Sequence, residues 1–293
     1  MKVLTLLAFV WILFNQRHFL EKINVQAISN FNTGLFLMVL ALVPLNWYFE
    51  FQKWKITLKS LDSFSRKESI ESFLSGIFSG FITPNFIGNF VGRVLYYPFK
   101  IRPKIILFTL LASYSQFLTT ITIGALFMLF YSSGNEFLSA QYHWIIFTFI
   151  VISWILYFTF EKLQLYKIKF LAFFRHFKLY RPNLSLKIQY IVFNLLRYIV
   201  FSVQYLLILN VFLEEFNLGL IVPITAIYFW STLIPNFIWG KLFLRESVAL
   251  VVLFPIIDNV NIILLASFSL SLINQIIPAI VGIPYLMKKK KYE

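Results

Sequence analysis

The chain contains no cysteine, and its only histidines are scattered, at His18, His143 and His176. Without cysteine there are no disulfide bonds and no thiol chemistry, and isolated histidines form no cluster with metal-ligand spacing. Acidic residues are also scarce, with 12 Asp and Glu against 26 Lys and Arg. HExxH, GxSxG, Walker-type and DxD-like motifs are all missing from the sequence. We therefore expect no enzyme activity, no cofactor and no metal site.

Charged residues make up only 13% of the chain, whereas 59% of residues are hydrophobic and the mean hydropathy is +0.78. A soluble domain carries about 25% charged residues, so this chain has too few to cover a water-facing surface. Its apolar runs reach the length of roughly 20 residues that a membrane helix needs. Alternation with a period of two does not dominate, which argues against an outer-membrane barrel. The composition predicts an all-α polytopic membrane protein, with a soluble helical domain as the alternative.

The apolar runs predict a single transmembrane domain over residues 1–293, with about six spanning helices and two helical hairpins. The hairpin runs are too short to span, and the first half of each stops at a proline, which removes a backbone donor and restricts the preceding residue. We expect re-entrant hairpins at residues 70–99, in the first half of the domain (1–131), and at 220–257, in the second half (144–287). The spans are expected at residues 3–14 (extending toward 20), 31–51, 105–131, 144–160, 188–212 and 262–287.

The basic residues are distributed unevenly among the connections. They concentrate in residues 52–69, 100–104, 161–187 and 288–291, whereas residues 132–143 contain no Lys or Arg. The positive-inside rule places the basic connections, and with them both termini, in the cytoplasm of a bacterial inner membrane. Three spans separate the hairpins, so the hairpins must point in opposite directions. The formal charge of +14 then indicates contact with anionic lipid rather than with nucleic acid.

Two segments keep alternative interpretations. Residues 3–14 follow a single lysine and lack a small-residue cleavage site, so we expect a retained helix, with a signal peptide as the alternative. Residues 161–186 mix basic with apolar side chains. This pattern fits an amphipathic helix on the inner leaflet and fits a solvated basic loop equally well.

The tetrapeptide Pro-Asn-Phe-Ile occurs twice, at residues 84–87 and 235–238, once in each expected hairpin. A chain this rich in Phe and Ile produces some repeated tetrapeptide by chance. Proline breaks in corresponding positions of two halves are more informative, because transporters often build midplane sites from interrupted helices. Glycines beside the breaks permit close backbone approach. The expected helix-break residues are Pro84, Gly88, Gly92, Pro235 and Gly240.

A few basic residues lie outside the connections, near the two breaks or within a span. An ionisable group at membrane depth costs several kcal/mol unless it is paired or hydrated, so it marks a functional site by default. Arginine presents a planar fork to phosphate oxygens, and helix N-termini favour anions. Converging hairpins would form an anion site in which Glu246 holds an arginine until the ligand displaces it. The expected substrate-binding residues are Arg93, Arg245, Glu246, Lys241, Asn85 and Asn236.

Each of these side chains also has a purely structural interpretation. Arg93 could extend to the cytoplasmic surface, and Arg245 with Glu246 could form a structural ion pair. Arg197, inside the run 188–212, is expected to make an interhelical contact, with lining of the pathway as the second possibility. Glu50, beside Trp47, is expected in an interfacial aromatic belt.

Three stretches resemble the transmembrane family named after lysylphosphatidylglycerol synthase, a family of flippase-like integral membrane proteins. They are residues 46–54, then Thr83-Pro84 with Gly88, Gly92 and Arg93, and finally Pro235 through Gly240 to Arg245-Glu246. The resemblance covers almost the whole chain, through short motifs. It departs from the family pattern at Phe243, where a glycine is usual, and at Arg93, where an acid is usual.

The resemblance implies translocation of an anionic phospholipid or polyprenyl-linked lipid between leaflets. The soluble aminoacyl transferase domain of some members is not expected after Met287, so lysine transfer is not implied. Membrane lipids, bound through an anionic headgroup, are the expected partners; nucleic acid is not, and a homo-oligomer is compatible with the sequence. The alternatives are a secondary transporter of a small anion, coupled to protons through Glu246, and a non-catalytic accessory subunit of envelope-lipid biosynthesis.

Overall fold

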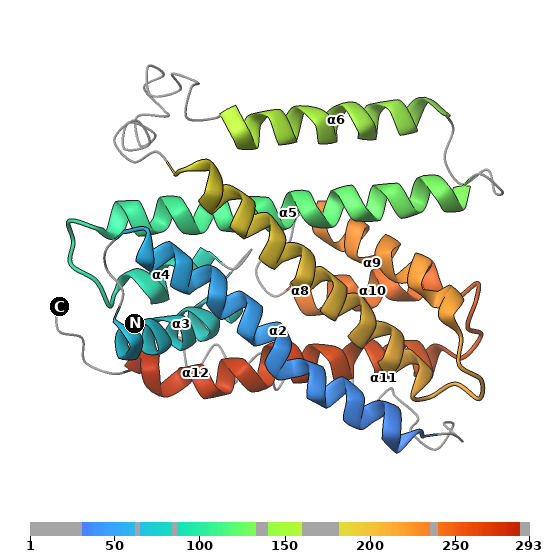
Figure 1. Ribbon diagram of the computed structural model, residues 1–293. Coiled ribbons are helices and arrows are strands. Elements are labelled where there is room, and N and C mark those ends of the chain that lie inside the picture. The colour runs from blue at the N-terminus through green and yellow to red at the C-terminus, as the bar shows by residue number, and fades with distance from the viewer. Residues whose placement is uncertain are drawn as a thin grey trace.

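The computed structural model describes residues 31–61, 65–83, 87–132, 140–159, 182–234 and 240–287, and within these ranges it contains helices and short connections but no strand (Figure 1). The all-α prediction is therefore confirmed for the described part of the chain. Four helices are long and apolar enough to cross a membrane, namely Thr33–Lys59, Arg102–Met128, Leu184–Asn210 and Val260–Met287. The expected span at 3–14 and most of the segment 161–186 lie outside the described residues.

Five of the expected spans correspond to helices of the structure. The long ones are α2 (Thr33–Lys59), α5 (Arg102–Ser132) and α8 (Leu184–Asn210). Helix α6 (Ala140–Thr159) packs on α5 and has a shorter apolar stretch, Trp144–Thr159. The last span consists of α11 (Val260–Ser271), a π-helical turn η6 (Leu272–Ile276) and α12 (Ile277–Met287), which follow one another without a gap.

Two pairs of helices occupy the regions of the expected hairpins. Helices α3 (Arg66–Phe81) and α4 (Ile87–Val94) form the first pair, and α9 (Ile221–Leu233), preceded by the short η5 (Leu218–Leu220), forms the second pair with α10 (Gly240–Leu253). The two members of each pair pack against each other. The break residues Pro84 and Pro235, with Asn85 and Asn236 beside them, lie outside the described residues.

The helical column from α11 to α12 supports both pairs. Helix α12 packs on α3 of the first pair, and α11 packs on α10 of the second (Figure 1). Glycine allows the closest of these approaches, because a Cβ atom on Gly282 of α12 would lie 2.4 Å from the backbone oxygen of Leu74. Small residues let membrane helices pack closely in this way. The first pair is equally tight, since a Cβ on Gly88 would lie 2.0 Å from the backbone oxygen of Ser79.

Asparagine side chains begin several helices. Asn32 Oδ1 accepts a hydrogen bond from the Leu35 amide at 3.1 Å, and Asn183 Oδ1 accepts one from the Leu186 amide at 2.8 Å. Such caps satisfy an amide that has no partner inside the helix. They set the start of α2 and of α8, the two helices that carry most of the polar side chains described below.

The distribution of side chains is that of a protein surrounded by lipid. On α6, Trp144 is 70% exposed and Ile145 is 64% exposed, and α2 presents Leu37 and Met38 outward. Polar side chains such as Asn46 and Gln204 are instead fully buried between helices. Polar groups inside a membrane protein face the bundle interior in this way. The described residues thus form a multi-pass arrangement with an apolar exterior and a polar interior.

The close approach of α12 to α3 predicts the effect of a single methyl group. We expect Gly282→Ala to lower the melting temperature in detergent by several degrees, because overpacking against a rigid backbone costs on the order of 1–3 kcal/mol. Gly34→Ala is the matched control, since Gly34 is exposed and its added Cβ would meet only the Asn32 side chain, at 3.3 Å. A Gly282→Ala protein as stable as the wild type would show that α12 does not pack as closely against α3 as described.

Candidate functional site

A polar stripe runs along one face of α2. Asn46, Glu50, Lys53 and Thr57 recur at intervals of four, three and four residues, which places them on the same side of a helix. Helix α2 continues to Lys59 rather than ending at residue 51 as expected, and this extension carries Lys53 into the interior. The expectation that Lys53 belongs to a basic connection at 52–69 is therefore wrong, because its side chain is only 4% exposed.

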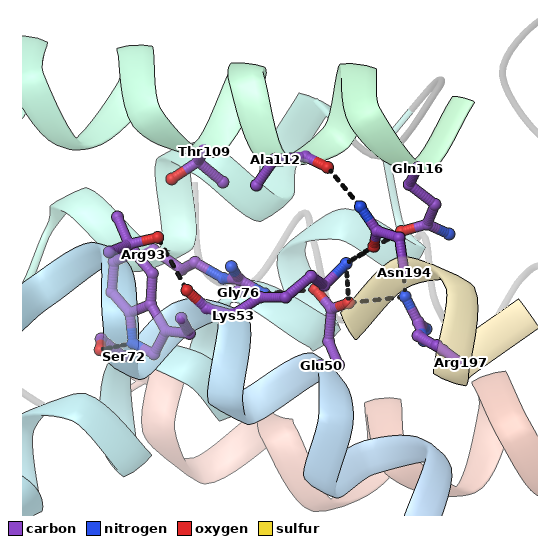
Figure 2. A network of polar contacts seen from close by, with 12 residues as sticks. Glu50, Lys53, Ser72, Gly76, Arg93, Thr109, Ala112, Gln116, Asn194 and Arg197 are labelled. Carbon is purple, nitrogen blue, oxygen red and sulfur yellow. Dashed lines mark hydrogen bonds and ion pairs between the residues drawn. The ribbon is translucent and has the colours of Figure 1, made fainter. Parts of the chain in front are cut away.

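Glu50 lies at the centre of an ionic cluster that three helices build. Its carboxylate is 2.6 Å from Lys53 Nζ on α2, 2.6 Å from Arg197 Nη1 on α8 and 3.3 Å from Arg93 Nη2 on α4. Figure 2 shows these side chains converging on the carboxylate between α2, α5 and α8. We call Glu50, Lys53, Arg93 and Arg197 the Glu50 cluster. The expected place of Glu50 in an interfacial belt is wrong, because the helix does not end beside it and its side chain points inward.

Neutral side chains from α2, α5 and α8 supply the remaining hydrogen-bond partners of two of the cations, Lys53 and Arg197. Lys53 Nζ donates to Gln116 Oε1 at 3.1 Å and to Asn194 Oδ1 at 2.6 Å, in addition to Glu50. Arg197 donates from Nε to Asn46 Oδ1 at 2.9 Å and from Nη1 to Gln116 Oε1 at 3.1 Å. Arg197 thus makes the interhelical contact that the sequence predicted. All three ammonium donors of Lys53 have an acceptor.

Arg93 is held differently, mainly by aromatic rings. Its guanidinium carbon lies 4.9 Å from the Trp54 ring centre and 5.3 Å from that of Phe73, both within cation–π range. Gly76 leaves room for this side chain, because a Cβ there would come within 2.6 Å of Arg93 Cγ. The residue is 3% exposed, and its buried Nε has no hydrogen-bond partner in the part of the chain that the structure describes. The alternative in which Arg93 reaches the surface is therefore wrong.

The Glu50 cluster carries an excess of positive charge. The three basic side chains against one carboxylate leave a formal charge of +2. Each of these side chains is at most 14% exposed, so solvent cannot neutralise the excess. A buried charge without a counter-ion costs several kcal/mol. Chemically, the arrangement is suited to binding an anion.

The wall beside Arg93 is formed by α3 and by the connection that follows α4. Trp54 Nε1 donates to the backbone oxygen of Ser69 at 3.0 Å and to Ser72 Oγ at 3.1 Å, and Tyr97 Oη lies 3.3 Å from the same Ser72 hydroxyl. Burial raises the pKa of Tyr97 well above its ordinary range, so the phenol remains neutral. This wall adds hydrogen bonds around Arg93 without adding a negative charge.

A second polar cluster lies where α10 packs on α11. Arg245 Nη2 donates to the backbone oxygen of Ser267 at 3.0 Å and to the hydroxyl of Ser271, and Ser271 Oγ donates to Glu246 Oε1 at 2.7 Å. Arg245 Nη2 is 3.6 Å from the same carboxylate oxygen, so the ion pair is looser than those at Glu50. We call Arg245, Glu246 and Ser271 the Glu246 cluster. The structural ion-pair interpretation of Arg245 and Glu246 is consistent with this geometry.

A chain of amide side chains extends from the Glu50 cluster to η6 and ends at the backbone oxygen of Val39. Asn46, which accepts from Arg197, donates to Asn274 Oδ1 at 3.0 Å, and Asn274 donates to Gln204 Oε1 at 3.2 Å. Asn274 lies in the π-helical turn η6, three residues after Ser271. Such turns occur frequently at functional sites. Polar side chains of α8, α2 and η6 are therefore linked within an otherwise apolar interior.

The structure keeps apart the residues that the sequence predicted as one site. Arg93 joins the Glu50 cluster, while Arg245 and Glu246 pair with each other, so Glu246 does not hold Arg93. The side chain of Lys241 and the residues Asn85 and Asn236 lie outside the described part. Sequence reasoning missed Glu50 and Lys53, although their spacing from Asn46 and Thr57 was a signal of a buried polar helix face.

Comparison of the chain with protein-family models, with curated proteins and with solved structures finds no match. Among the described residues, no group of three or more His, Cys, Asp or Glu side chains is placed to hold a metal ion. The arrangement of charges is therefore the information from which a function can be argued.

Removing the single carboxylate of the Glu50 cluster should destabilise the fold strongly. We expect Glu50→Gln to lower the free energy of unfolding by about 3–5 kcal/mol, because three buried cations then lack a counter-ion. Thermal unfolding in detergent measures the change, with the exposed Glu214→Gln as control. Adding Lys53→Met to Glu50→Gln should restore part of the loss, since it removes one of the uncompensated charges. A Glu50→Gln protein with wild-type stability would contradict the charge assignment.

Proposed function

We propose that this protein is a flippase-like membrane protein that binds an anionic lipid headgroup at the Glu50 cluster and moves the lipid between leaflets. The observation that carries the proposal is the buried excess of positive charge, in which Lys53, Arg93 and Arg197 share one carboxylate. A phosphate group would neutralise that excess, and guanidinium groups bind phosphate oxygens in a planar fork.

Arg93 is the residue that we propose as the first contact of the ligand. Its contact with Glu50 is the longest of the three, at 3.3 Å against 2.6 Å for the other two. Its Nε is buried without a partner, whereas Lys53 already has three acceptors. An incoming phosphate would therefore compete with Glu50 for Arg93, while Lys53 and Arg197 hold the carboxylate in place.

The choice of a lipid rather than a soluble anion rests on supporting observations. Apolar side chains face outward on α2, α6 and α8, as they do in a protein surrounded by acyl chains. The chain also resembles, at residues 46–54 and around Pro84 and Pro235, the transmembrane family named after lysylphosphatidylglycerol synthase. In this proposal the α3–α4 and α9–α10 pairs are inverted re-entrant hairpins, a device by which transporters place binding sites near the midplane.

Reconstitution tests the proposal directly. Vesicles containing the purified protein and a fluorescent phosphatidylglycerol are treated with a membrane-impermeant quencher, and the rate at which label reaches the quenched leaflet is measured. We expect Arg93→Gln to reduce this rate about tenfold or more, because one charge-assisted contact contributes about 1.5–3 kcal/mol. The variant should still fold, since Glu50 keeps Lys53 and Arg197 as partners.

Arg66→Gln is the matched control, because Arg66 is an exposed arginine at the start of α3. Wild-type protein that leaves the lipid distribution unchanged would overturn the proposal, and so would equal rates for Arg93→Gln and wild type. A parallel arm measures uptake of radiolabelled inorganic phosphate into the same vesicles. Phosphate uptake without lipid movement would identify the ligand as a soluble anion.

A further inference from the structure

The Glu246 cluster differs from the Glu50 cluster in its balance of charge. One arginine faces one carboxylate, so the cluster is neutral only while Glu246 is ionised. The Glu246 side chain is 4% exposed and that of Arg245 is 11% exposed. With Glu246 ionised, this second site has no excess positive charge that would favour an anion. The excess charge of the Glu50 cluster therefore does not explain why Arg245 and Glu246 are buried.

Two atoms of the cluster are buried without a hydrogen-bond partner among the described residues, and they belong to opposite sides of the ion pair. They are Glu246 Oε2, an acceptor, and Arg245 Nε, a donor. Buried polar atoms in a folded protein normally have a partner. A carboxylate oxygen that is buried without one is a position at which a proton can bind without breaking an existing hydrogen bond.

The arginine does not depend on the carboxylate for its position. Arg245 Nη2 is held by the backbone oxygen of Ser267 and by the Ser271 hydroxyl, whereas its distance from Glu246 is 3.6 Å, beyond a hydrogen bond. Protonation of Glu246 would therefore leave Arg245 in place as a buried cation without a counter-ion. An anion near Arg245 would then be favoured, so proton binding and anion binding would strengthen each other.

Few other ionisable groups surround the carboxylate in the described part of the chain. Helix α8 contributes Tyr205, whose hydroxyl contacts Ser267 Oγ, and α9 contributes Tyr228, whose ring lies 5.9 Å from that of Tyr205. Helix α11 contributes only the serine hydroxyls of Ser267 and Ser271. Apart from Arg245, no described charged side chain is placed to offset protonation of Glu246. The side chain of Lys241, one turn earlier on α10, is not described.

From this geometry we infer that Glu246 binds a proton from the aqueous phase and couples proton movement to movement of the anion. The inference rests on the proposed function, and it adds the coupling ion to that function. In the coupled step, Oε2 gains a proton on one side of the membrane and loses it to water on the other. Asn274, which bonds to Asn46 beside the Glu50 cluster, lies three residues after Ser271 of the Glu246 cluster in the same helical column, so this column carries contacts to both sites.

The test uses full-length protein in vesicles with the same pH inside and outside, so that no gradient drives the fluorescent phosphatidylglycerol. We expect the wild-type exchange rate to rise by about threefold or more as the pH falls from about 8 to about 6, because a lower pH increases the protonated fraction of Glu246. Glu246→Gln, a permanently neutral mimic of the acid, should exchange lipid at a rate that does not change with pH. Glu214→Gln, an exposed glutamate, should keep the wild-type profile.

A second variant keeps the test decisive if Glu246→Gln fails to fold, as judged by size-exclusion chromatography. Ser271→Ala removes a hydrogen bond that the ionised carboxylate accepts. Loss of that bond disfavours the charged form, so the pH profile should shift toward higher pH. A pH-sensitive dye inside the vesicles gives an independent measurement. With the outside made more acidic than the inside for this measurement, we expect proton entry to accompany lipid movement with wild type and to be absent with Glu246→Gln.

The outcomes separate the two claims. If wild-type protein moves no lipid at either pH, the proposed function fails. If lipid moves at the same rate at both pH values, or if neither Glu246→Gln nor Ser271→Ala alters the pH profile, proton coupling fails and the proposed function stands.

Discussion

The interaction on which the interior depends is the sharing of the Glu50 carboxylate by Lys53, Arg93 and Arg197. Coulomb interactions are strong in a medium of low dielectric constant, so one anion can hold cations from α2, α4 and α8 together. The neutral partners Gln116 and Asn194 fix the orientation of these side chains but cannot cancel their charge. The packing of α2, α5 and α8 is thus built around an electrostatic imbalance, and any ligand of the site must be considered in relation to it.

The helical column formed by α11, η6 and α12 gives the site its frame. Gly282 lets α12 approach α3, and Ser267 and Ser271 on α11 hold Arg245. Between them, the π-helical turn carries Asn274, which reaches Asn46 on α2. A π turn inserts one residue into the helical register and rotates the side chains that follow it. This helical column can therefore present a small residue to the α3–α4 pair, and polar residues to α2 and to the α9–α10 pair.

How far the sequence predicts this structure depends on the kind of signal. Apolar run length and the positions of proline predicted the long helices and the two pairs of shorter ones, because these signals act within a single segment. The same logic failed at the end of α2, where Lys53 was assigned to a connection. Hydropathy alone cannot distinguish a lysine that leaves the membrane from one that turns inward to a carboxylate on the same helix. Arg93 contacts Glu50 rather than Glu246 because of how the helices pack. The sequence of a single segment does not determine that packing.

The two clusters differ in a way that suggests separate roles in the proposed function. The Glu50 cluster carries excess positive charge in its resting state, so an anion is favoured there as long as its basic side chains are protonated. The Glu246 cluster is neutral while Glu246 is ionised, so it favours an anion only after Glu246 is protonated. A transporter in which both sites bound anions with equal strength would retain its ligand, whereas release requires that one site be weak for part of the cycle. We assign pH-dependent anion binding to the Glu246 cluster for two reasons. Its ion pair is longer, at 3.6 Å, and one oxygen of Glu246 has no hydrogen-bond partner among the described residues.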